Sequence, residues 1–150
     1  MSLRIAFRAA TAAVLAAAAI PSAATAGSSF SGLYVFGDSL VDAGNTNILT
    51  NGAAPTPGLG YFGGRFTNGP NYVDYISSAY FGQLTKASLL GGSNFSFGGA
   101  RVVSDTTDFI PDITPQLNAY KAASGNTADP NALYILNAGG NDVFAIGRFL

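Results

Sequence analysis

An apolar run gives way to a polar turn in the stretch Val35-Phe36-Gly37-Asp38-Ser39-Leu40-Val41-Asp42-Ala43-Gly44-Asn45. Residues 33–36 are all apolar or aromatic, which predicts a short buried strand. Gly37, Asp38 and Ser39 all favour turns, so we expect the strand to end there. A serine at the carboxyl end of a buried strand lies at the rim of a sheet, where open α/β folds place their ligands. An ordinary turn is the alternative interpretation of the same three residues.

The composition excludes several kinds of site. The chain has 150 residues, which suits one domain, and it contains neither cysteine nor histidine. Without these residues a disulfide, a thiolate metal site and the commonest general base are all absent, and we expect no metal ligands. The net charge is −1, so no basic surface is indicated and we expect no nucleic-acid partner.

Residues 1–26 are predicted to be a signal peptide, and residues 27–150 the mature part. Arg4 and Arg8 precede an Ala-rich apolar run, and Ala24-Thr25-Ala26 offers the small residues that a signal peptidase reads. A membrane anchor is the alternative, but the run is shorter than the roughly 20 residues that span a bilayer. We therefore expect an exported protein, secreted, periplasmic or on the cell surface, with no stable membrane span in its mature form.

The remaining sequence predicts alternating helices and strands. A long glycine-rich loop is expected from Asp42 to Pro70, where Tyr61, Phe62 and Phe66 either line a substrate pocket or hold the loop to the core. A helix is expected to begin with Pro70 in its first turn and to end near Phe81. Further expected elements are a strand at 94–97, a helix from a Thr114 cap to 123, a buried strand at 132–138 and a helix from 143.

Two later strands also end in distinctive turns. Gly98-Gly99 follows the strand at 94–97, and Gly139-Gly140-Asn141-Asp142 follows the strand at 132–138. Taken singly, the first is compatible with a simple turn and the second with a helix N-cap pair. Together with Phe36-Gly37-Asp38-Ser39-Leu40, and in this order, they resemble the first three signature blocks of the GDSL, or SGNH, hydrolase family.

The resemblance implies a three-layer α/β/α domain around a parallel sheet of about five strands, of which three are found here. It also implies that Ser39 is the nucleophile of a serine ester hydrolase. The backbone N–H groups of Ser39 and Gly98 and the side-chain amide of Asn141 would then hold the oxyanion. Such chemistry needs no metal or organic cofactor, and the expected partner is a small-molecule or lipid ester.

One family feature has no counterpart in this sequence. A serine hydroxyl needs a base, which in the family is a histidine in an Asp-x-x-His block, and this sequence has no histidine. We therefore expect the N-terminal part of a longer esterase or lipase. The alternatives are an inactive remnant or binding fragment and, less favoured, a carbohydrate O-acetyl esterase or acyltransferase.

Overall fold

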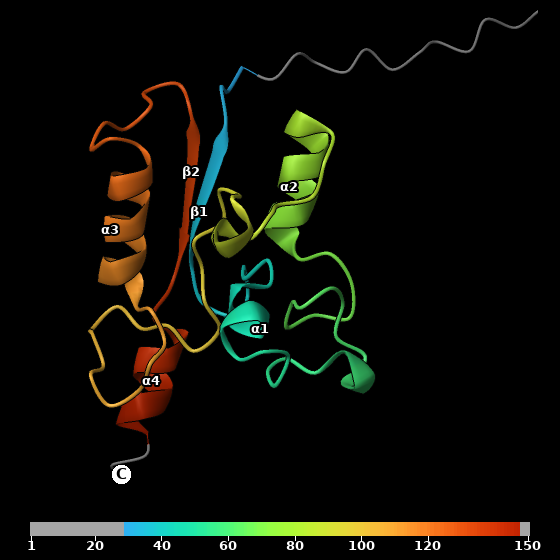
Figure 1. Cartoon of the computed structure of the whole chain (residues 1–150), viewed down its shortest axis with the longest axis vertical. Helices are drawn as coiled ribbons and strands as arrows, with labels where there is room; N and C mark the ends of the chain where they lie inside the picture. The colour runs from blue at the N-terminus through green and yellow to red at the C-terminus, as the bar shows by residue number, and fades with distance from the viewer. Residues whose placement is uncertain (1–28, 148–150) are drawn as a thin grey trace, which may run out of the picture.

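The structure is a computed structural model that describes residues 29–147, so the predicted signal peptide lies outside the described residues (Figure 1). Its elements follow one another in an order that mixes strands with helices. They are β1 (Leu33–Gly37), α1 (Asn45–Leu49), the 3₁₀ turn η1 (Pro57–Leu59), α2 (Tyr72–Phe81), the 3₁₀ turn η2 (Ser88–Leu90), α3 (Ile113–Ala123), β2 (Leu133–Asn137) and α4 (Gly140–Ile146).

The sheet is parallel and has β1 at its centre. β1 pairs with β2 in a register that places Leu33 opposite Leu133. On the other side of β1, the N–H of Phe97 donates to Gly37 O at 3.0 Å, and two further backbone bonds join residues 93–95 to Val35. The segment at 93–97 therefore hydrogen-bonds as a third strand, although only one residue in it forms a regular bridge with β1.

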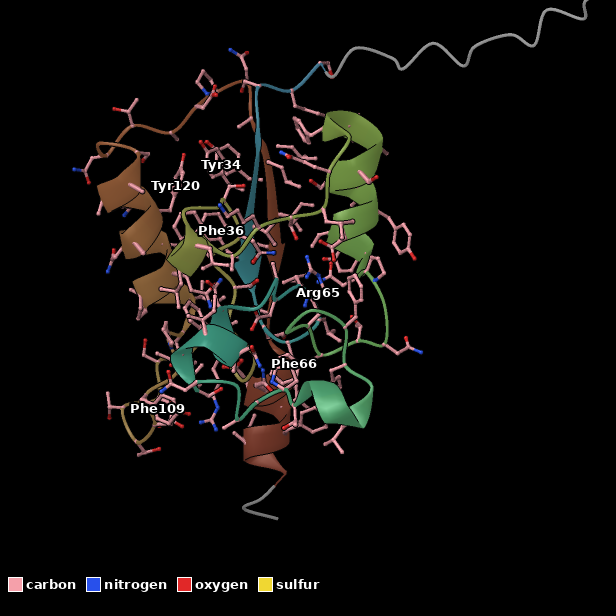
Figure 2. The ribbon with its side chains drawn as sticks, turned by 45° about the vertical axis from the view of Figure 1, so that its right-hand side comes forward. Tyr34, Phe36, Arg65, Phe66, Phe109 and Tyr120 are labelled. Carbon is pink, nitrogen blue, oxygen red and sulfur yellow. The ribbon has the colours of Figure 1, made fainter. Side chains whose placement is uncertain are left out.

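Helices α2 and α3 lie on opposite sides of this sheet (Figure 1). Toward α2, Val35 of β1 packs with Val41 and Val73 in a fully buried cluster. Toward α3, Phe36 packs with Phe95 and with Tyr120 (Figure 2). A strand that is buried on both faces is typical of parallel sheets covered by helices. The predicted α/β class is confirmed, with a partial sheet.

Three predicted boundaries are wrong by a few residues. α2 begins after Asn71, whose side chain accepts from Asp74 N while Asp74 accepts from Asn71 N. This capping box satisfies the first helical donors, so Pro70 precedes the helix. α3 has Asp112 as its N-cap, and the predicted cap Thr114 lies within the helix. α4 begins three residues before the predicted start.

The strand predicted at 132–138 is present, but the prediction that it is buried is wrong. Tyr134 and Leu136 are exposed, the latter by 62%, because only β1 pairs with β2 among residues 29–147. None of the residues of α4 is buried. Within the described part of the chain, no helix is long and apolar enough to cross a membrane.

A buried ion pair between Arg65 and Asp74 connects the glycine-rich loop to α2. Arg65 Nε donates to Asp74 Oδ2 at 2.6 Å and Nη2 donates to Oδ1 at 2.9 Å, and both side chains are almost completely buried. Arg65 Nη2 also donates to Thr85 O at 2.9 Å, and the Thr85 hydroxyl donates to Asp74. Burial raises the pKa of Asp74, but the hydrogen bonds from Arg65 and Thr85 outweigh it and hold the pKa below its usual range.

Replacing Arg65 by Met should lower the free energy of unfolding by about 3–5 kcal/mol, because Asp74 would remain buried and unpaired. The matched control is Lys121→Met on the exposed side of α3, which should change it by less than about 0.5 kcal/mol. Chemical denaturation measures both values. Equal, small losses for the two variants would contradict a stabilising role for the pair.

Candidate active site

The three predicted turns lie at one edge of the sheet. Asp38 N donates to Asn137 O at 3.2 Å across β1 and β2, and Gly37 O accepts from Phe97 N on the other side. The segments that continue from these strands therefore leave the sheet side by side, at the carboxyl ends of its strands. Open parallel sheets bind their ligands at this edge.

Ser39 lies in a tight turn that Asp38 stabilises. The side chain of Asp38 is buried, and its Oδ1 accepts from Leu40 N at 3.0 Å and from Asn137 Nδ2 at 3.1 Å. Asp38 O accepts from the N–H groups of Val41 and Asp42. Ser39 itself is half-buried, and neither its hydroxyl nor its N–H has a hydrogen-bond partner within residues 29–147.

A buried carboxylate connects this turn to the second glycine-rich turn. Asp42 is fully buried, and its oxygens accept from the N–H groups of Gly44, Asn45 and Thr46 at 2.7, 2.8 and 3.2 Å. The same carboxylate accepts from Gly98 N at 3.0 Å. The motifs described above predict no role for Asp42, although an aspartate two residues before a glycine is typical of a turn of this kind.

Gly98, the predicted oxyanion donor, has its N–H directed into the protein. Besides Asp42, this group donates to Thr46 Oγ1 at 2.6 Å. Gly98 also lies against the ring of Phe66, so closely that a Cβ added at position 98 would be 2.3 Å from Phe66 Cε2. Glycine is therefore required here for a close approach of the loop to the main chain.

Gly99 differs from Gly98 in its exposure and in the partners of its N–H group. It is exposed, its φ of +95° is in the region that favours glycine, and its N–H has no partner within residues 29–147. Gly99 and Asn141 line the same cavity, which has a volume of about 280 Å³. The structure thus brings Asn141 together with Gly99, and it places Gly98 behind them.

Helix α4 contains Asn141, and two of its side chains hydrogen-bond to the backbone that follows the Gly98-Gly99 turn. Asn141 Nδ2 donates to Ala100 O at 2.8 Å. Asp142 accepts from the N–H groups of Val102 and Val103 at about 3 Å. Hydrogen bonds from Val103 and then Val102 hold the pKa of Asp142 below its usual range. Neither side chain caps α4, because its N-cap is Gly139 without a side-chain bond.

The three aromatic residues proposed as substrate contacts make contacts within the loop. The Tyr61 and Phe66 rings meet edge to face with centroids 6.2 Å apart. The Arg65 guanidinium lies 5.6 Å from the centroid of Phe62. Phe66 also lies against Gly98, outside the loop, and this contact supports the alternative role of holding the loop to the core for Phe66. None of the three residues lines the cavity of Gly99 and Asn141. Substrate contact stays a prediction.

Comparison with known proteins decides the family. The model of the GDSL-like lipase/acylhydrolase family matches residues 33–147. The chain belongs to the GDSL lipase/acylhydrolase family. This confirms the resemblance, and the match spans all three signature blocks.

Two relatives indicate the extent of the GDSL match. Lipase 1 of Photorhabdus luminescens is 36% identical over 119 residues, which are 79% of this chain and 17% of that protein. GDSL esterase/lipase 6 of Arabidopsis thaliana is 32% identical over an alignment of 139 residues. That alignment covers 75% of this chain and 38% of that protein. The chain therefore spans well under half the length of these relatives.

The contact between Phe66 and Gly98 can be tested with a double-mutant cycle. Gly98→Ala should destabilise the chain by about 1–3 kcal/mol, because the new methyl group would overlap the Phe66 ring. In a Phe66→Ala background the same substitution should cost less by about 1 kcal/mol or more. Chemical denaturation of the four proteins gives the coupling energy, and a cost that is equal in both backgrounds would contradict the contact.

Proposed function

We propose that the protein to which this chain belongs is a serine ester hydrolase, with Ser39 as its nucleophile. The observation that carries the proposal is the position of Ser39 in a rigid turn at the carboxyl end of the central strand. Its hydroxyl is free of protein partners within residues 29–147, and the turn with Gly99 and the helix with Asn141 follow strands that end at the same sheet edge. The relatives named as esterases and lipases support the same reaction class.

The proposed reaction is acyl transfer. Ser39 Oγ attacks the ester carbonyl, and its proton passes to a base. The carbonyl oxygen becomes an oxyanion, which we propose is held by the N–H groups of Ser39 and Gly99 and by the amide of Asn141. A donor of this kind typically contributes about 3–4 kcal/mol in the transition state.

We place the glycine donor at Gly99 instead of Gly98. Two hydrogen bonds already use the N–H of Gly98. Redirecting it would remove the shorter of the two hydrogen bonds to the buried Asp42 Oδ2, leaving the one from Thr46 N, and such a loss is costly. The N–H of Gly99 needs no such rearrangement. Asn141 uses its Nδ2 for one bond to Ala100 O, which leaves a second N–H on the same nitrogen for a substrate.

The base is proposed to come from residues outside these 150. The sequence has no histidine, and no described carboxylate hydrogen-bonds to Ser39. This chain by itself is therefore proposed to be inactive, while the intact protein is an exported esterase or lipase acting on a small-molecule or lipid ester.

Ser39→Ala should abolish ester hydrolysis by the intact protein, since the acyl group would have no nucleophile. Ser78→Ala, on the exposed side of α2, is the matched control and should retain full activity. Hydrolysis of p-nitrophenyl acetate and labelling with a fluorophosphonate probe measure the effect. An active, labelled Ser39→Ala protein would rule out the nucleophile, and labelling of the isolated 150-residue chain would show that its base lies within it.

A further inference from the structure

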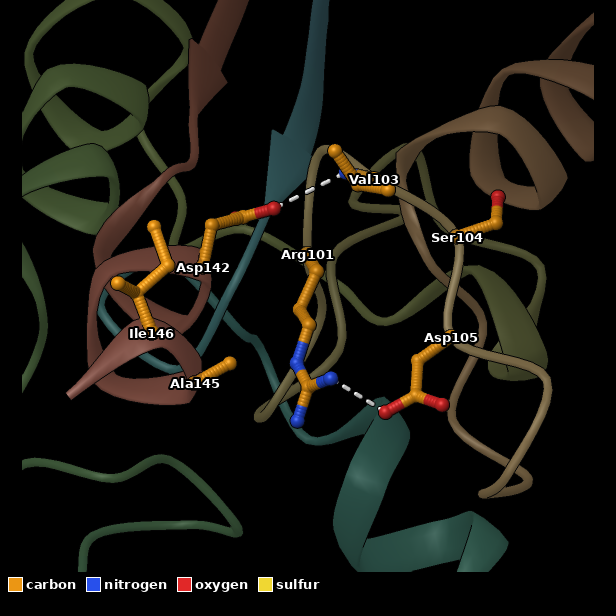
Figure 3. A pocket seen from close by; sticks show the side chains of 7 residues that line it. All are labelled: Arg101, Val103, Ser104, Asp105, Asp142, Ala145 and Ile146. Atoms are coloured by element: carbon orange, nitrogen blue, oxygen red, sulfur yellow. Dashed lines mark hydrogen bonds and ion pairs between the residues drawn. The ribbon is translucent and has the colours of Figure 1, made fainter. Parts of the chain in front are cut away.

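Two adjoining cavities flank Arg101, directly after the glycine turn. The one described above, of about 280 Å³, is lined by Gly99, Asn141 and Arg101. The other, of about 330 Å³, is lined by Arg101 and by residues of the 103–105 loop and of α4 (Figure 3). Arg101 and Ala145 line both. A group bound at Arg101 would therefore lie beside the proposed oxyanion donors.

The guanidinium of Arg101 has one edge without a partner. Its Nη1 pairs with Asp105, but Nε is buried and has no acceptor within residues 29–147, and Nη2 has none either. In Figure 3 Asp105 lies on one side of the guanidinium and Ala145 of α4 on the other. In Arg65 the corresponding Nε and Nη2 donate to both carboxylate oxygens of Asp74. Nη2 can donate to a ligand oxygen without rearrangement, whereas the buried Nε can reach a second, neighbouring oxygen only after the side chain moves.

The charges around the cavities favour a neutral ligand over an anion. Of the residues that line them, Arg101 is the one cation, while Asp105, Asp108 and Asp142 are carboxylates. Asp108 Oδ1 accepts from Ile110 N, and Asp108 Oδ2 has no partner within the described residues. An anion would be repelled by the three carboxylates, whereas a hydroxyl group can accept from Arg101 and donate to Asp108.

The apolar wall of the first cavity suits the same kind of ligand. Phe144 is 73% exposed and lines the cavity of Gly99 and Asn141. A sugar presents C–H groups on one face and hydroxyl groups at its edge, which matches an aromatic ring beside a donor and an acceptor.

We propose that this site binds the alcohol moiety of the substrate and that this moiety is a neutral polyol such as a sugar. This rests on the proposed ester hydrolysis and names the substrate class for it. Arg101 would donate from Nη2 to one hydroxyl oxygen and, after the side chain moves to uncover Nε, from Nε to an adjacent one. Asp108 would accept from one of these hydroxyl groups. The ester carbonyl would then lie toward Gly99 and Asn141.

The test compares three acetates in the intact protein, so that the acyl group is constant: methyl 6-O-acetylglucopyranoside, hexyl acetate and acetoxyacetate. We expect the sugar ester to have the highest kcat/KM. Arg101→Lys keeps the positive charge but removes the planar guanidinium with its several donors. This substitution should lower one ratio, kcat/KM for the sugar ester divided by kcat/KM for hexyl acetate, by about tenfold. A tenfold change is equivalent to one charge-assisted hydrogen bond. Asp108→Asn should lower it in the same direction. Asp129→Asn, at the far end of the sheet, is the control.

Binding of the sugar ester to the Ser39→Ala protein, followed by saturation-transfer NMR, tests the site without catalysis. Binding should be weakened by about tenfold in Ser39→Ala/Arg101→Lys and unchanged in Ser39→Ala/Asp129→Asn. Preference for acetoxyacetate would indicate an anion site, preference for hexyl acetate a lipid-like substrate, and either would overturn the proposal. A ratio unaffected by both site variants, or no binding of the sugar ester, would also overturn it. Failure of the Ser39-dependent hydrolysis, with sugar binding intact, would instead contradict the proposed function alone.

Discussion

The fully buried carboxylate of Asp42 is the interaction on which the candidate site depends. It accepts four backbone N–H groups, three from the residues that begin α1 and one from Gly98. A buried carboxylate without such donors would be strongly destabilising, so these backbone groups are held where the charge needs them. The turn after β1 and the turn after residue 97 are therefore fixed relative to each other by one side chain.

Neighbouring polar side chains extend this connection. Asn71 Nδ2, at the N-cap of α2, donates to Asp42 O. Asn45 Nδ2 donates to the backbone oxygens of Asn94 and Ser96 at 2.7 and 3.0 Å, and Asn94 Nδ2 donates to Val41 O at 2.7 Å. These side chains are buried. Fully satisfied buried networks of this kind make a local structure rigid and unique, and an oxyanion site works best when its donors are preorganised.

The sequence predicted the parts of the site that depend on local patterns. Hydrophobic runs located β1 and β2, and turn residues marked the three strand ends that meet at one sheet edge. It could not predict which N–H of the glycine pair points into the protein, because this depends on Asp42 and Thr46, which lie more than fifty positions away from Gly98. The sequence also predicted the burial of β2 wrongly. An apolar run shows that a strand can be buried, but it does not show which neighbouring elements cover the strand. The free edge of Arg101 likewise depends on a pairing that spacing alone does not specify.

The most direct test of the central claim is backbone hydrogen exchange at the two adjacent glycines, measured by NMR on the chain of 150 residues. We expect the Gly98 amide to exchange slowly, because Asp42 and Thr46 both accept from it, and the exposed Gly99 amide to exchange near the rate of an unprotected glycine. Protection of Gly99 together with rapid exchange of Gly98 would contradict the claim that Asp42 holds the first N–H inward and leaves the second free for a substrate.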